Sequence, residues 1–159
     1  MKATSMFIVA PALAIAAQFA LADAGHHHPG AEVTFGSPGK ESEVARTVEV
    51  SASDKMRFTP GKLDVKQGET IKFVVKNVGR VKHEFSIGDR AAHRAHALMM
   101  KQMPDMKHED DPTTIAVDPG QTKTVIWKFD KKPAGPLEIA GHEPGHYEAG
   151  MKMTVVLGK

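Results

Sequence analysis

The sequence lacks cysteine altogether, and its 159 residues include one tryptophan and one tyrosine. Without cysteine the chain can form no disulfide framework, no lipid-attachment site and no thiolate metal ligand, so its stability must come from a packed core. An excess of one charge is also lacking, because 21 Lys and Arg residues stand against 19 Asp and Glu residues. The composition therefore gives no reason to expect a nucleic acid or an acidic membrane surface as a partner.

Residues 1–24 have the pattern of a secretory signal peptide. A basic start is followed by an apolar run to Ala20 and by small residues that allow cleavage after Ala22 or Ala24. A proline and a glutamine interrupt the run, which is too short for a membrane span. We expect an exported, periplasmic protein with no membrane attachment after cleavage.

Residues 25–43 are predicted to be a disordered tail and linker, since they are rich in Gly, Ser, Pro and Glu. The tail contains His26, His27 and His28, and a histidine tract can bind metal or simply remain solvated. Cleavage after Ala24 would make His27 the third residue of the new N-terminus, where the amine, two backbone amides and the imidazole could hold Cu(II). Cleavage after Ala22 would remove that chelate.

From residue 44 to 159 we expect one all-β domain, because apolar residues alternate with polar ones in short runs separated by Gly and Pro turns. Such runs include Thr113–Val117, Thr122–Phe129 and Met151–Leu157. This spacing is typical of a β-sandwich. Within it, Trp127 and Phe129 are two residues apart and can both face the core.

An insertion at residues 89–111 breaks the strand pattern. Its Ala, Leu, Met and Lys content predicts a helix that ends near Met103, before Pro104. The insertion holds the secondary metal-binding candidates His93, His96, Met99, Met100, Met103, Met106 and His108. Several share one helical face, which either packs the helix onto the sandwich or forms a soft Cu(I) site.

The principal candidate site lies on the segment Leu137–Val156, where a Pro/Gly loop between two strand-like runs carries His142, His146 and Met151. A hairpin loop of this kind can aim His146 and Met151 at one point. His83, at the start of another alternating run, is the best candidate for a third ligand. Imidazole nitrogens with a soft thioether favour copper, Cu(I) in particular.

Three segments, Phe58–Ile87, Asp118–Phe129 and Glu138–Met151, resemble the cupredoxins, the plastocyanin and azurin family, and most closely its periplasmic copper-tolerance members. The resemblance implies a Greek-key β-sandwich with a short helical insertion. It places the copper ligands of the family at His83, Gly141, His146 and Met151, so a glycine stands where the family has its thiolate. Asn77 resembles the family residue that tethers the ligand loop by hydrogen bonds.

Without the thiolate the intense colour of a blue-copper centre should be absent. His142, Glu143 or water could replace the missing ligand. We therefore predict a periplasmic copper-binding protein for copper tolerance that sequesters or transfers Cu(I) or Cu(II) and is not an enzyme. Its partners would be copper ions and another periplasmic copper-handling protein. The alternatives are an electron-transfer cupredoxin, a copper-dependent Cu(I) oxidase, and a metal-free interaction module.

Overall fold

The computed structural model describes residues 33–103 and 111–158. The predicted signal peptide and the histidines of the tail lie outside these residues. So do residues 104–110, which include the candidates Met106 and His108.

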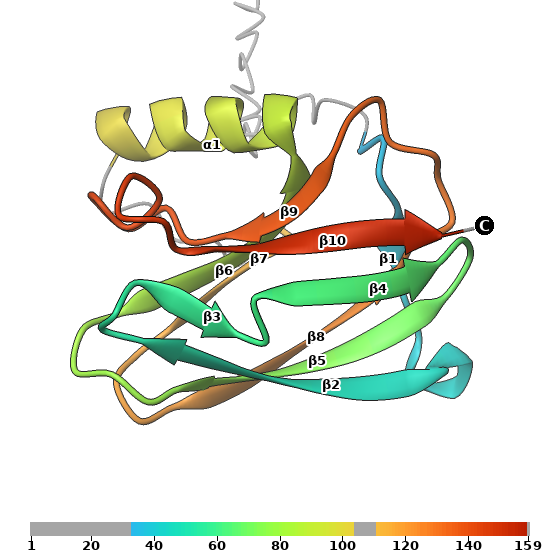
Figure 1. The fold of residues 1–159 in the computed structure, drawn as a ribbon, viewed down its shortest axis with the longest axis horizontal. Coiled ribbons are helices and arrows are strands. Elements are labelled where there is room, and N and C mark those ends of the chain that lie inside the picture. The colour runs from blue at the N-terminus through green and yellow to red at the C-terminus, as the bar shows by residue number, and fades with distance from the viewer. Residues whose placement is uncertain (1–32, 104–110, 159) are drawn as a thin grey trace, which may run out of the picture. The chain divides into compact units, whose positions relative to one another are not determined.

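The described chain forms a sandwich of two five-stranded sheets (Figure 1). The first sheet has the order β1 (Ser37–Pro38), β8 (Thr122–Lys128), β5 (Thr70–Asn77), β2 (Arg46–Ser53) and β3 (Arg57–Thr59). The second has the order β4 (Lys62–Lys66), β10 (Lys152–Gly158), β9 (Leu137–Ala140), β6 (His83–Asp89) and β7 (Thr114–Val117). Strands β2 and β5 pair in parallel, as do β4 and β10, and the other pairs are antiparallel. The predicted all-β sandwich is confirmed.

The core lies between the sheets and follows the alternation of the sequence. In β5, Ile71, Phe73 and Val75 are fully buried, because successive side chains of a strand point to opposite faces. Trp127 and Phe129 are also fully buried, as their spacing predicted.

Residues 33–43 belong to the sandwich, so the prediction of an unstructured linker through residue 43 is wrong for these residues. Phe35 is buried with its ring centroid 5.7 Å from that of Trp127. Ser37 and Pro38 pair with β8, and a 3-10 turn follows at Glu41–Glu43. The reason is that one aromatic side chain completes the core, a contribution that the polar composition of the stretch conceals.

The predicted helix is α1 (Arg90–Gln102), which lies over β6 and β9 on the outer face of the second sheet (Figure 1). Asp89 caps its start by accepting hydrogen bonds from the backbone N–H groups of Ala91 and Ala92. The helix ends just before Met103 and Pro104, as expected. None of the described helices has the length and apolar character of a membrane span.

Three connections gather at one end of the sandwich, on the left of Figure 1. They are the turn 54–56 between β2 and β3, the loop 78–82 between β5 and β6, and the loop 141–151 between β9 and β10. The candidate site lies where they meet.

Candidate metal centre

The loop 141–151 is a hairpin connection folded back on itself. At its base Gly141 N–H donates to Met151 O at 3.0 Å, and within it Met151 N–H donates to His146 O at 3.0 Å. Gly145 and Gly150 have φ values of +82° and +94°, which glycine adopts without steric cost. The backbone therefore directs His146 back toward the end of β6.

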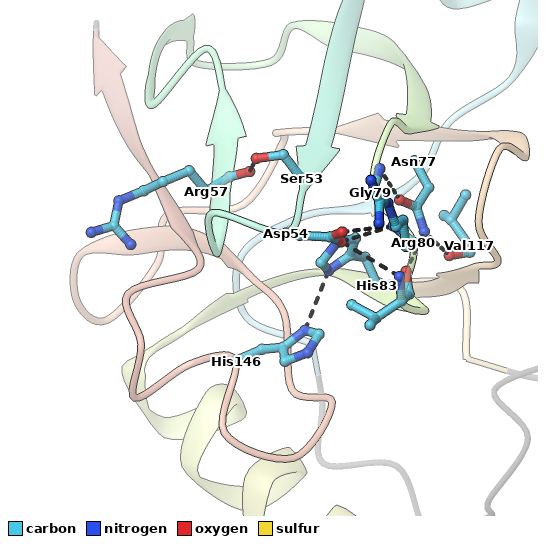
Figure 2. Close-up of polar contacts among 10 residues, drawn as sticks. Ser53, Asp54, Arg57, Asn77, Gly79, Arg80, His83, Val117 and His146 are labelled. Atoms are coloured by element: carbon cyan, nitrogen blue, oxygen red, sulfur yellow. Dashed lines mark hydrogen bonds and ion pairs between the residues drawn. The ribbon is translucent and has the colours of Figure 1, made fainter.

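His83 and His146 lie against each other at the end of the sandwich, with their ring centroids 5.0 Å apart and their ring planes tilted by 52° (Figure 2). Their Nδ1 atoms are 3.3 Å apart, and the exposed fractions of the two residues are 0% and 9%. Two metal–nitrogen bonds of about 2.0–2.1 Å at a tetrahedral angle place the nitrogens about 3.3 Å apart. The pair is thus spaced as two imidazole ligands of one metal ion would be.

Met151, the third predicted ligand, lies at the base of the loop, where its backbone pairs with Gly141. It is fully buried, and a Cβ atom added to Gly141 would lie 3.1 Å from Met151 Sδ. The thioether therefore lies beside the position at which the resemblance places the thiolate. Two nitrogens and a soft sulfur fit copper better than magnesium or calcium.

The electrostatics of the site favour neutral imidazole. Burial, and next the charge of His83, lower the pKa of His146, so its ring keeps a free lone pair at neutral pH. Glu143, a substitute ligand by sequence, instead forms an ion pair with Lys82 at 2.8 Å. This hydrogen bond raises the pKa of Lys82 and joins the two loops of the site.

Asn77 is fully buried and holds the loop that precedes His83. Its Nδ2 donates to Val81 O at 2.7 Å and to Val117 O at 2.8 Å, while its Oδ1 accepts from Gly79 N–H at 2.8 Å. The resemblance indicated a tether for a ligand loop. The loop held by these bonds is 78–82, not 141–151.

His142 does not join His83 and His146. Its Nε2 lies 3.0 Å from Nδ1 of His93, whose Nε2 lies 3.1 Å from the carbonyl oxygen of Glu138. The expectation that His142 replaces the missing ligand is therefore not supported. The reason is that a side chain at position 141 would face Met151, whereas His142 points toward His93 of α1.

The helix face predicted from the spacing of His93, His96 and Met100 is real, since all three are buried. His96 Nε2 lies 2.9 Å from Glu84 Oε1, a fully buried carboxyl group. Met99 is half-buried, and Met103 is exposed. Across residues 33–103 and 111–158, no group of three or more His, Asp or Glu side chains is arranged to hold a metal ion. A copper site on this face stays a prediction.

With this geometry established, comparison with known proteins identifies the family. Residues 44–158 match the model of copper-binding proteins of the plastocyanin/azurin family. The chain belongs to the plastocyanin/azurin family. Copper, predicted from the ligand types, is thereby confirmed as the cofactor.

Curated relatives in this family share most of the chain. The copper-resistant cuproprotein CopI of Rubrivivax gelatinosus is 44% identical, covering 94% of this chain and 97% of that protein. Proteins of the same name from Pseudomonas aeruginosa and Vibrio cholerae are 36% and 38% identical, covering 74% and 77% of this chain and 78% and 71% of theirs.

Solved structures confirm the fold of a plastocyanin/azurin-family protein. Auracyanin B matches with a TM-score of 0.60 at 23% identity, covering 79% of this chain and 97% of its own. The reduced auracyanin of Roseiflexus castenholzii matches with a TM-score of 0.59 at 18% identity, covering 73% and 99%.

One residue of this cupredoxin site has no signal in the sequence. Asp54 Oδ1, in the turn between β2 and β3, lies 3.3 Å from His83 Nε2. No spacing rule connects positions 54 and 83, because the contact depends on how the two sheets pack.

Proposed function

We propose that this protein serves copper resistance in the periplasm by binding copper through His83, His146 and Met151 and then storing it or passing it on. The observation that carries the proposal is the 3.3 Å separation of the two Nδ1 atoms. The curated relatives, named copper-resistant cuproproteins, support the physiological role.

The ligand types favour storage or transfer over electron transport. A blue-copper centre depends on a thiolate in a trigonal plane with two imidazoles, and Gly141 supplies no side chain. Two imidazoles and a thioether bind Cu(I) through soft donors, and Cu(II) as an ordinary nitrogen centre. Binding and release of the ion, rather than turnover of a substrate, is the role that this set supports.

The test is copper stoichiometry and affinity in the double variant His83→Ala/His146→Ala. A matched control, His93→Ala/His96→Ala, removes two buried histidines that lie outside the proposed site. Competition with chromophoric Cu(I) and Cu(II) chelators should show loss of the tightest copper ion from the first variant only. Circular dichroism should show that both variants remain folded. Retention of the tightest ion in the first variant would contradict the proposal.

A further inference from the structure

The carboxylate of Asp54 lies on the side of the His83 ring that is turned away from His146. His83 presents Nδ1 to His146 and Nε2 to Asp54 Oδ1, at 3.3 Å each (Figure 2). The ring therefore connects the proposed metal position with an acidic side chain. The resemblance to cupredoxins gives no role to Asp54.

Backbone groups of the loop 78–82 fix this carboxylate in place. The N–H of Arg80 donates to Asp54 Oδ1 at 2.9 Å and to Oδ2 at 2.8 Å, and the N–H of Val81 lies 3.4 Å from Oδ1. Because the Arg80 N–H donates to both oxygens, the carboxyl group acts as a hydrogen-bond acceptor in this contact. An ionised carboxylate only accepts hydrogen bonds, so the shared proton is on His83 Nε2. The lone pair of His83 is then on Nδ1, which points toward His146.

Gly79 leaves the space in which the Asp54 carboxylate can lie close to His83. A Cβ atom added to Gly79 would overlap Asp54 Oδ1 and lie 3.0 Å from His83 Nε2. Any side chain at position 79 would displace the Asp54 carboxylate from its place beside His83. The chain thus keeps a glycine where the carboxylate has to reach the imidazole.

We propose that Asp54 is a positioning residue for the copper site, which holds His83 in the Nε2-protonated tautomer and places a negative charge one imidazole ring away from the metal. The inference rests on the proposed function. Partners of this kind orient ligating histidines and increase their basicity. The charge also has a specific use in this chain, because Gly141 removes the one anionic ligand of the family. A negative charge attracts Cu(II) more strongly than Cu(I).

The test compares Asp54→Ala, which removes the acceptor, with Asp54→Asn, which keeps an oxygen acceptor and removes the charge. Asp64→Asn is the matched control, because Asp64 is an exposed carboxylate paired with Lys62 instead of a histidine. Nitrogen-15 NMR of the copper-free protein reports the tautomer of His83. Chelator competition reports the affinities for Cu(I) and Cu(II), and voltammetry reports the midpoint potential.

In Asp54→Ala we expect loss of the tautomer preference and a fall of about 10–100-fold in copper affinity, the range seen when such partners are removed. In Asp54→Asn the tautomer should persist, while Cu(II) affinity falls more than Cu(I) affinity and the midpoint potential rises. Asp64→Asn should match the wild type in every measurement.

An Nε2-protonated His83 in Asp54→Ala, or unchanged copper affinities in both Asp54 variants, would overturn the proposal. The tautomer measurement needs no copper, so it is independent of the proposed function. Full copper binding by His83→Ala/His146→Ala would instead overturn the proposed function.

Discussion

Replacing Gly141 with cysteine would return a thiolate to the one family ligand position that this chain leaves without a side chain. Gly141 is buried at the base of the ligand loop, and its φ lies outside the left-handed region, so an L-residue fits its backbone. An added Cβ would lie 3.0 Å from Glu84 O, 3.1 Å from Met151 Sδ and 3.3 Å from Met151 Cγ. The thioether and the neighbouring backbone must therefore yield by a few tenths of an ångström.

That crowding is mild, because two of the three contacts are to a flexible methionine side chain. Overpacking of a core costs typically 1–3 kcal/mol, and we expect Gly141→Cys to lower the unfolding free energy by about 1 kcal/mol, the lower end of that range. The added thiolate would lie beside Met151, at the position where the family has its thiolate ligand. We therefore expect Cu(II) to produce an intense sulfur-to-copper charge-transfer absorption that the wild type lacks.

The assay is visible absorption during Cu(II) titration, with urea unfolding of the copper-free protein measured alongside. Gly141→Ser is the matched control, since it adds a side chain of similar size without a thiol and should stay colourless with a similar loss of stability. A folded Gly141→Cys protein that binds one Cu(II) without colour would refute the inference that the loop keeps the family geometry.

Three further predictions follow from the same geometry. Met151→Leu should weaken Cu(I) binding more than Cu(II) binding, while urea unfolding changes by less than about 1.5 kcal/mol because the swap conserves volume; equal Cu(I) affinity would exclude the thioether as a ligand. Burial lowers the pKa values of His93 and His146, so the unfolded chain takes up protons first as the pH falls. The unfolding free energy of the copper-free protein should therefore be highest above about pH 6.5 and decrease below it, by up to about 1.4 kcal/mol per pH unit for His93 and less for His146, which is nearer solvent; constant stability from pH 7.5 to 5.5 would contradict this. The third prediction concerns the four methionines of the insertion, which are Met99, Met100, Met103 and Met106. Replacing all four with leucine should lower the Cu(I) stoichiometry without unfolding the domain. Unchanged stoichiometry would exclude a copper site there.

The fold was predictable because the physical rules that build it act locally. Alternation along β5 predicts which side chains face the core. Asp89 in the sequence marks the start of the helix, and Pro104 marks the point before which it ends. The linker at residues 33–43 was misassigned because its place in the sandwich depends on contacts with distant β8, namely the packing of Phe35 on Trp127 and the pairing of Ser37 and Pro38. Composition averages over a segment and does not register a single packed ring.

The site was predictable only in part. The resemblance associates His83 with His146 across 63 residues, and spacing within one loop adds Met151. The direction of His142 depends on how the loop leaves β9 after Ala140, and that path appears only in the folded structure. The contact of Asp54 with His83 likewise depends on the packing of a turn against a loop, so no local pattern reveals it.

The central claim is that His83, His146 and Met151 bind one copper ion. The most direct test is copper X-ray absorption of the Cu(I)-loaded wild type and of His83→Ala/His146→Ala, each at one copper per chain. The account predicts two imidazole nitrogens and one sulfur around copper in the wild type, and loss of the paired imidazole signal in the variant. An identical spectrum from both proteins would contradict it, because the ion would then be bound outside the His83 and His146 pair.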